Sequence, residues 1–394
     1  MRVLISGAGI AGPALAFWLH RAGADVTVVE RSAAPRPGGH AIDVRGVART
    51  VVERMGLRER IRARQVDERG FALVSSSGRR LAAVPATAFG GEGIVAEIEI
   101  ARGDLAEILL EAASGADYRF GDRITAVDDG AVRFASGGTE RFDVIVGADG
   151  VHSSTRRLVF GPDERFVRYL GGYTAYFTVG DPGDLDHWLL MHTATGGRGA
   201  YLRPENGGTA KAGLSFLHPS PDFDRLPRAE AERVIAGKLA GVGWRVPELL
   251  AAMPAAPDFY CDSLNQVRVD RWWRGRVALI GDAGYCGSPL AGMGTSMSLV
   301  GAYVLAGELA GAGDPERAFA AYQREMADYV AAGIQLPPGG MRMAAPRSRA
   351  MIGARILMAR MMTRWPSRQI AEMQFDKADA ITLRDYPALT GQRR

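Results

Sequence analysis

Cysteine is scarce in this chain of 394 residues, which holds only two. Cys261 and Cys286 form no close pair, and neither stands in a Cys/His spacing typical of zinc ligands. The sequence therefore predicts no disulfide framework and no metal site. We expect a reducing, cytoplasmic setting, because disulfides persist mainly in oxidising compartments.

Long apolar runs and blocks of one charge are also missing. No stretch approaches the ~18 uncharged apolar residues of a membrane-spanning helix, and the chain opens on an expected core strand rather than on a signal peptide. The formal net charge is only +4, and the basic residues are spread along the chain. These features argue against a membrane span and against a nucleic-acid partner.

Glycine, by contrast, is abundant, and it marks the first motif. The apolar run Val3 to Ile5 leads into a GxGxxG turn, and a helical stretch continues from Ala11 to Ala22. Such a turn presents backbone N–H groups and a helix N-terminus to a pyrophosphate. After a second apolar strand comes a glutamate placed to accept hydrogen bonds from ribose hydroxyls. The predicted dinucleotide-binding residues are Gly7, Gly9, Ile10, Ala11, Gly12, Glu30 and Arg31.

Later strands end in residues suited to the same sheet edge. Ile98 to Ile100 leads to Arg102 at the mouth of a helix, with Asp104 as its expected N-cap. Two buried-strand patterns end in Asp149-Gly150 and Gly281-Asp282. Open α/β sheets bind ligands at the carboxyl edge, so we expect these residues to meet there.

Residues 69–98 and 168–267 have a different pattern of apolar and polar residues. Short alternating runs separated by Gly, Pro and Asp turns predict an antiparallel sheet. Many of its side chains are aromatic or large, so the sheet could wall a hydrophobic ligand pocket. For each residue, ordinary sheet core is the alternative. The candidate substrate residues are Tyr173, Phe177, Trp188, Met191, Tyr201 and Phe216, and Tyr176 and Tyr260 share the pattern.

The predicted fold class is α/β, with an interrupted Rossmann-like domain and an antiparallel substrate domain. The first comprises residues 1–68, 99–167 and 268–340, and the second residues 69–98 and 168–267. A helical segment, 341–394, follows. Its Met- and Arg-rich stretch, Met341 to Trp365, could lie on a membrane surface, cover a substrate, or pack across both domains.

These motifs, in this order, resemble the single-component, class A flavin-dependent aromatic hydroxylases of the p-hydroxybenzoate hydroxylase fold. The resemblance covers nearly the whole chain and implies FAD as cofactor. It implies that Asp282 contacts the ribitol-phosphate part of FAD and that Arg102 reaches the pyrophosphate. Asp149-Gly150 is associated with both FAD and NAD(P)H in this family.

The resemblance also implies that the loop after Asp282 lies against the isoalloxazine ring. Its candidate residues are Pro289, Gly292, Met293, Gly294 and Thr295. The loop leads into an apolar helical run, Ser296 to Leu309, so backbone N–H groups can face the negative edge of reduced flavin. Ser296, Gly301 and Gly284-Tyr285 depart from the family pattern, which bears on flavin positioning and substrate fit.

The implied activity is an NAD(P)H-consuming monooxygenase. It would insert one oxygen atom from O₂, through a flavin C4a-hydroperoxide, into an aromatic or polyketide-like small molecule. The alternatives are a flavin-dependent halogenase, an isoprenoid reductase, or a non-catalytic flavin-bound protein that holds a ligand. NADPH versus NADH, hydroxylation versus Baeyer–Villiger insertion, and monomer versus homodimer stay open.

Few side chains are candidates for acid–base or gating roles. His40 lies in a Gly-rich loop near the expected flavin crevice and could assist substrate deprotonation, with a solvated loop position as the alternative. Arg45 could gate the flavin or meet an NAD(P)H phosphate, with an ordinary surface position as the alternative.

Overall fold

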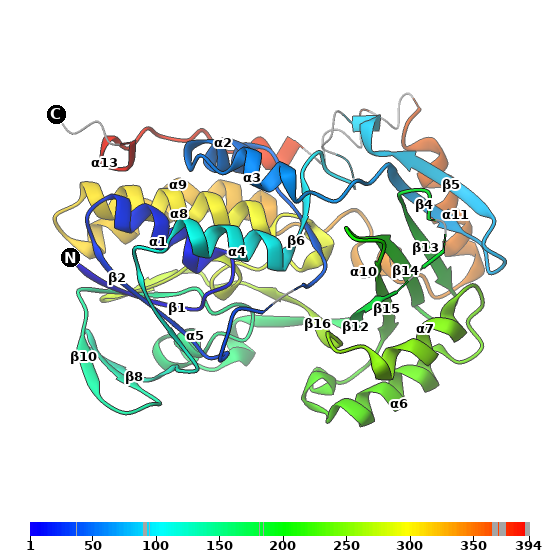
Figure 1. Cartoon of the computed structure of the whole chain (residues 1–394), viewed down its shortest axis with the longest axis horizontal. Helices are drawn as coiled ribbons and strands as arrows, with labels where there is room; N and C mark the ends of the chain where they lie inside the picture. The colour runs from blue at the N-terminus through cyan, green and yellow to red at the C-terminus, as the bar shows by residue number, and fades with distance from the viewer. Residues whose placement is uncertain are drawn as a thin grey trace.

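The computed structural model describes residues 1–36, 38–89, 93, 95–180, 182–183, 185–364, 369 and 376–390. Figure 1 shows two lobes side by side, each built around a β-sheet. The first lobe carries most of the helices and both termini, and the second lobe carries the larger sheet. The predicted α/β fold with a second, mainly antiparallel sheet is confirmed.

The first lobe is built on a six-stranded sheet in the order β17-β18-β11-β1-β2-β7. All its pairs are parallel except the edge pair β17-β18. The central strands are buried along almost their whole length, which matches their near-continuous Val and Ile content. The strands are β1 (Arg2–Ser6), β2 (Asp25–Glu30), β7 (Asp117–Phe120), β11 (Val144–Gly147), β17 (Trp273–Arg274) and β18 (Val277–Leu279).

Helices cover one face of this sheet, and a small sheet covers the other. Helix α8 is buried on nearly every side because it packs against α1, α2 and α9, which explains its lack of a polar face. On the opposite face, a three-stranded sheet packs through Ile124, Val132 and Phe134 against Leu4 and Ile145. The elements are α1 (Ala11–Arg21), α2 (Val47–Arg54), α3 (Arg58–Ala63), α4 (Arg102–Ala112), α5 (Ser154–Val159), α8 (Gly294–Gly311), α9 (Pro315–Gly333), β8 (Ile124–Asp128), β9 (Ala131–Phe134) and β10 (Thr139–Arg141).

The second lobe is built on a seven-stranded sheet in the order β16-β12-β15-β14-β13-β4-β5. Its neighbours are antiparallel apart from the parallel pair β13-β4. Helices α6 (Arg228–Leu239) and α7 (Val246–Ala252) cover one face. The strands are β4 (Gly70–Val74), β5 (Arg80–Pro85), β12 (Val167–Val179), β13 (Trp188–Ala194), β14 (Arg198–Pro204), β15 (Ala210–Leu217) and β16 (Tyr260–Val267).

A buried ion cluster joins the two lobes. Arg203 on β14 donates from Nε to Glu68 at 2.8 Å and pairs through Nη2 with Glu99, and both carboxylates are almost fully buried. Glu99 begins β6 (Glu99–Ala101), which pairs with β3 (Ala41–Asp43) beside the glycine-rich loop. The cluster therefore fixes this ribbon against the seven-stranded sheet.

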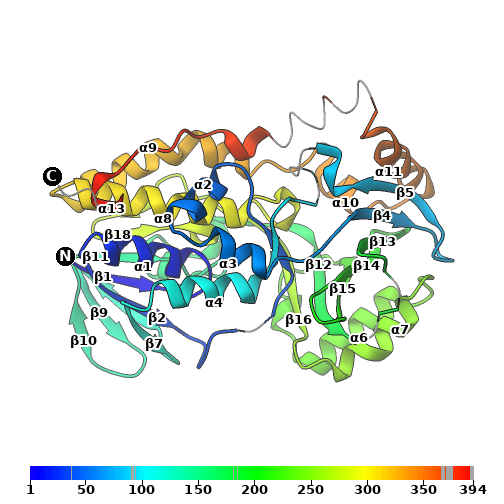
Figure 2. The same cartoon turned by 45° about the horizontal axis from the view of Figure 1, so that its top comes forward.

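The C-terminal segment runs across both lobes, as Figures 1 and 2 agree. Helix α11 (Arg349–Met361) packs Ile356 and Ala359 against β4 and β5, with Met362 just after it in the same cluster, while α13 (Pro387–Thr390) lies beside α8. Leu357, Met358 and Met361 are exposed. Trp365 lies outside the described residues. A short helix, α10 (Gly340–Ala344), precedes α11. Among the described residues, none of the helices has the length and apolar character needed to cross a membrane.

Short 3-10 turns complete the framework. Two of them, Gly281–Ala283 and Pro289–Ala291, belong to the second glycine-rich region. Another, Asp376–Asp379, packs against α2 and α9 and returns the C-terminal segment to the first lobe. The others are Ala86–Phe89, Asp163–Arg165, Phe223–Arg225 and Met253–Ala255.

Candidate active site

A large cleft of about 2050 Å³ lies between the two lobes. The carboxyl ends of β1, β2 and β11 line one part of it, and β13, β14 and β16 line another. Single small-molecule sites measure roughly 300–1,000 Å³. The cleft therefore has room for a dinucleotide and a second ligand together.

The first glycine turn brings two backbone segments unusually close. Gly7 has a φ of +111°, and a Cβ there would lie 2.5 Å from the carbonyl oxygen of Ala148. A Cβ on Gly12 would lie 1.9 Å from the carbonyl oxygen of Gly7. Helix α1 then begins without a side-chain cap and without an acidic residue in its first turn. Its first N–H groups are thus free to receive an anion.

Glu30 is anchored at the end of β2. Its carboxylate accepts hydrogen bonds from the backbone N–H groups of Ala8 and Ser32, both at 2.9 Å. Burial opposes ionisation of Glu30, but these hydrogen bonds outweigh it and hold the pKa below its ordinary value. Glu30 and Arg31 both line the cleft, so a charged carboxylate faces it beside the glycine turn.

Arg102 lies directly beside the same turn. Its Nη2 is 3.4 Å from where a Cβ on Gly9 would stand, and its backbone N–H donates to the carbonyl of His40 at 3.1 Å. Helix α4 begins at Arg102 with Ala101 at the N-cap position. The prediction of Asp104 as N-cap is therefore wrong, because the helix starts earlier and places Asp104 inside its first turn.

The second glycine loop forms another open helix end. Gly292 adopts the left-handed conformation, with φ 65°, and α8 begins at Gly294 with no side-chain cap and no acidic residue in its first turn. Asp282 Oδ1 lies 3.6 Å from where a Cβ on Gly294 would stand. Burial raises the pKa of Asp282 above its ordinary value. Pro289, Met293 and Thr295 also line the cleft.

Aromatic rings of the second lobe form the opposite part of the lining. Tyr176 stacks on Tyr260 with ring centroids 4.9 Å apart and on His40 at 5.0 Å, and it meets Tyr201 edge to face. Met191 lies in the same lining. His40 Nδ1 and the hydroxyl of Tyr260 form a hydrogen bond of 2.6 Å. The predicted aromatic wall exists, but only part of it consists of the residues expected.

Four of the predicted substrate residues face away from the cleft. Tyr173, Phe177 and Phe216 are fully buried in the core beneath α6 and α7, because alternate residues of a strand point to opposite faces. Trp188 stacks with Arg80, whose guanidinium carbon lies 5.0 Å from the ring centroid, and is not part of the lining. The sheet-core alternative is correct for the first three.

The comparison with known families decides the identity. A family model described as "FAD binding domain" matches residues 1–335. This chain belongs to the FAD-binding domain family. A flavin-dependent monooxygenase of Legionella longbeachae serogroup 1 (strain NSW150) is 37% identical over 336 residues, which cover 84% of this chain and 86% of the relative.

Solved structures support the same assignment. The crystal structure of tetracycline destructase Tet(51) superimposes with a TM-score of 0.81 at 32% identity and covers 98% of both chains. Klebsiella pneumoniae HpxO, complexed with FAD and uric acid, has a TM-score of 0.77 at 21% identity, covers 98% of each chain and shows the shared fold. This family member is a FAD-dependent monooxygenase.

The cleft of this monooxygenase fits FAD on its own geometry. The close backbone approaches at Gly7 and Gly12 leave no room for a Cβ, and two uncapped helix N-termini, those of α1 and α8, open on the same cleft. Two such anion-binding ends in one cleft suit a ligand with a pyrophosphate and a second electron-rich edge.

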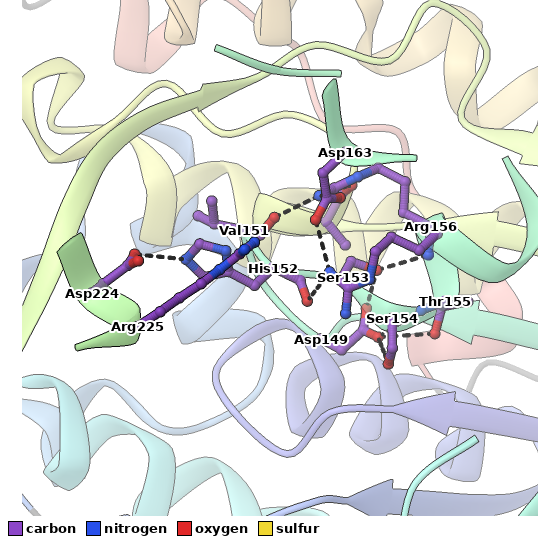
Figure 3. A network of polar contacts seen from close by, with 12 residues as sticks. Asp149, Val151, His152, Ser153, Ser154, Thr155, Arg156, Asp163, Asp224 and Arg225 are labelled. Carbon is purple, nitrogen blue, oxygen red and sulfur yellow. Dashed lines mark hydrogen bonds and ion pairs between the residues drawn. The ribbon is translucent and has the colours of Figure 1, made fainter. Parts of the chain in front are cut away.

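Asp149 lines the cleft and also forms hydrogen bonds within the protein. Figure 3 shows its carboxylate at the start of α5, surrounded by hydroxyl groups. It accepts hydrogen bonds from the Thr155 N–H at 2.9 Å, from the Thr155 and Ser154 hydroxyls at 3.0 Å each, and from the Ser153 hydroxyl. Asp149 therefore orders the turn that follows β11, and this turn lines the cleft.

Arg156 is a residue that the sequence did not single out. It is fully buried and donates to the carbonyls of Ala283 and Val151, at 2.9 and 2.6 Å, and to Asp163 at 2.6 Å. Ala283 is the neighbour of Asp282, so Arg156 ties the Asp149 turn to the second glycine region. The one sequence feature that could have indicated this role is its position directly after Ser153-Ser154-Thr155. Arginine is usually exposed, so burial of Arg156 was not expected.

Arg45 and Lys377 also line the cleft. Arg45 is buried, its guanidinium pairs with Asp43 at 2.7 Å, and its backbone N–H donates to the Ser296 hydroxyl at 3.0 Å, so the surface alternative for it is wrong. Lys377 comes from the C-terminal segment and donates to the carbonyl of Ala291 at 2.8 Å. No sequence motif pointed to Lys377.

His152 links the lobes at the edge of the cleft. Its Nε2 lies 3.7 Å from Asp262 and 3.8 Å from Asp224, the latter contact being visible in Figure 3. Interaction with Asp262 raises the pKa of His152 above its ordinary value, against the effect of burial, and Asp224 adds to the rise. In its protonated form, His152 can pair with these two carboxylates of the second lobe.

This pairing predicts a pH-dependent contribution to stability. Because the pKa is higher in the folded than in the unfolded state, the stabilisation is complete below ~6.5 and disappears as the pH rises through the folded pKa. The difference in free energy of unfolding between the wild type and His152→Gln should shrink over that window in urea titrations from pH 5.5 to 8.5. The exposed His20→Gln serves as control, and a pH-independent difference for His152→Gln would contradict the pairing.

Proposed function

We propose that this monooxygenase uses NAD(P)H and O₂ to insert one oxygen atom into an aromatic or polyketide-like small molecule bound against Tyr176, Tyr201 and Tyr260. The observation that carries the proposal is the placement of this aromatic wall and the loop Pro289–Thr295 in one cleft. Tet(51), a tetracycline destructase, supports a fused-ring substrate class.

In this proposal the first lobe holds FAD along its length. Gly7 to Gly12 and Arg102 receive the pyrophosphate, Glu30 receives the adenosine ribose, and Asp282 receives the ribitol part. The loop Pro289–Thr295 and the start of α8 face the isoalloxazine ring. Bound FAD would supply the redox chemistry that accepts electrons and activates O₂.

The remaining work of the protein is to orient the substrate and keep water out. The phenol rings of Tyr176, Tyr201 and Tyr260 stay protonated, because burial raises the pKa of each above its ordinary value. The hydroxyls of Tyr176 and Tyr201 can therefore donate hydrogen bonds to a carbonyl or phenol of the substrate, while the faces of the three rings stack on its rings.

His40 is better suited to positioning than to proton abstraction. Burial, with Arg102 and Arg203 nearby, lowers the pKa of His40 to about 4. General-base catalysis is most effective when the pKa lies near the working pH. We therefore assign His40 the role of fixing the Tyr260 hydroxyl through its hydrogen bond.

Nicotinamide binding is proposed to be transient. The sequence holds one GxGxxG turn, which the FAD half occupies in this assignment, so NAD(P)H has no dinucleotide fold of its own. The same cleft, or its mouth, would then receive the nicotinamide.

The test is a turnover screen with purified, FAD-loaded protein. Simple phenols and fused-ring polyketides, tetracycline included, are offered with NADPH or NADH, and both cofactor oxidation and product mass are followed. We expect at least one fused-ring compound to stimulate oxidation and gain one oxygen atom. A protein that binds these compounds without turnover would instead be a flavin-bound ligand-binding protein.

Replacing Tyr176 with alanine should weaken binding of the substrate found in this screen about tenfold or more, because the stacked ring is lost. The substrate concentration dependence of NADPH oxidation measures the change. The matched control is Trp188→Leu, an aromatic of the same sheet outside the cleft, which should alter the KM less than about twofold. Equal effects of the two substitutions would place the substrate elsewhere.

A further inference from the structure

Lys377 is a partly buried cation without a carboxylate partner. Its Nζ donates to the backbone carbonyls of Ala291 at 2.8 Å and Gln335 at 3.4 Å, and within the described part of the chain no carboxylate lies within 4.0 Å of it. The other lysines differ, since Lys211 pairs with Asp258 at 2.8 Å and Lys238 is exposed on α6. A cation removed from water without a counter-charge has an energetic cost, so its placement calls for an explanation.

The surroundings of Lys377 point to the cleft. Lys377, Ala291 and Gln335 all line it, and Ala291 lies in the loop Pro289–Thr295. An ammonium group carries three N–H donors, and the two carbonyls use two of them. One donor and the positive charge of the ammonium form thus remain for a ligand beside this loop.

The neighbouring charges do not supply the missing partner. Burial lowers the pKa of Lys377, and the positive charge of Arg45 lowers it further, while the Arg45 guanidinium is itself paired with Asp43 at 2.7 Å. Asp376, next in the chain, is exposed and also lines the cleft, but it forms no ion pair with Lys377. Among the described residues, no carboxylate neutralises Lys377 by direct contact, and an anion bound there would be favoured.

We propose that Lys377 is an anion-binding residue of the flavin site that favours reduced over oxidised FAD. Oxidised isoalloxazine is neutral, whereas the reduced ring carries negative charge at its N1–C2=O edge, so a nearby cation binds the reduced form preferentially. The inference rests on the proposed placement of the ring at the loop Pro289–Thr295. It also assigns a cofactor contact to a segment outside residues 1–335, the range that the family model matches.

Two substitutions separate charge from tethering. Lys377→Gln removes the charge but keeps a side-chain donor for the Ala291 carbonyl, and Lys377→Arg keeps the charge. Lys238→Met, an exposed lysine, is the control. The midpoint potential of bound FAD, compared with that of free FAD, gives the relative affinity for the two redox states without any turnover, and titration with oxidised FAD shows whether binding itself is intact.

We expect Lys377→Gln to reduce the preference for reduced FAD about tenfold, and Lys377→Arg and Lys238→Met to change it less than about threefold. An unchanged preference in Lys377→Gln with intact FAD binding would overturn the inference, as would equal losses in Lys377→Gln and Lys377→Arg, which would indicate a structural role. If the wild type binds no FAD, the proposed cofactor site fails, and the inference about Lys377 fails with it.

Discussion

Replacing Gly12 with alanine should abolish measurable FAD binding and lower the free energy of unfolding by about 3 kcal/mol. The new Cβ would stand 1.9 Å from the carbonyl oxygen of Gly7, which is backbone and cannot swing aside. The turn must open, and the N–H groups that begin α1 then leave the pyrophosphate position. Urea unfolding and fluorescence titration with FAD measure the two effects.

The matched control is another glycine-to-alanine change in a helix. Gly237 on α6 has no atom within 4 Å of its Cβ position, so alanine there should leave FAD binding unchanged and raise stability by up to about 1 kcal/mol. If Gly12→Ala bound FAD as tightly as the wild type, the cofactor could not be held at this turn.

Replacing Arg156 with methionine should lower the free energy of unfolding by about 3 kcal/mol. Methionine fills part of the space but leaves the carbonyls of Val151 and Ala283 without their donor and removes the buried partner of Asp163. FAD affinity should fall as well, because Ala283 adjoins Asp282. Chemical denaturation and FAD titration of the same preparations give both quantities.

Arg157 provides the control for Arg156, since it contacts the same carboxylate at 2.8 Å from an exposed position. Exposed pairs contribute roughly 0–1 kcal/mol, so Arg157→Met should cost little. Similar losses for the two variants would mean that the interaction with Asp163, rather than the buried link to the Ala283 carbonyl, is what matters.

The backbone framework of the cofactor lobe was predictable because its determinants are local. Each motif combines a buried strand, a glycine that must approach another backbone closely, and a helix start, and these leave strong patterns in a few consecutive residues. The strand before Gly7, the helix from Ala11 and the strand before Gly281 all formed as expected. The predicted N-cap at Asp104 was wrong because α4 begins directly after β6, so that Ala101 takes the N-cap position.

The aromatic lining of the cleft was harder to predict, because it depends on which face of a strand each side chain occupies. Tyr173 and Tyr176 are alike in sequence texture, yet they lie on opposite faces of β12, one beneath α6 and the other against His40. Large side chains occur on both faces, so alternation alone does not say which face is covered by helices. The pairing of β12 with β15 and β16 is needed to decide it.

Residues that act through distant contacts left the weakest signal. Arg156 reaches the carbonyl of Ala283, and Lys377 reaches that of Ala291, through long separations in sequence. Both hydrogen bonds are accepted by backbone carbonyls, which every residue has, so no pattern of residue types predicts them. The contribution of the C-terminal segment to the cleft depends on its return to the first lobe, which its sequence does not indicate.

Labelled oxygen gives the sharpest test of oxygen insertion. The FAD-loaded protein is supplied with NADPH, ¹⁸O₂ and a compound that stimulates NADPH oxidation, and the mass of the product is measured by mass spectrometry. The proposed function predicts one ¹⁸O atom in each product molecule and none when the label is supplied as water. NADPH oxidation with an unaltered compound, or oxygen that comes from water, would contradict it.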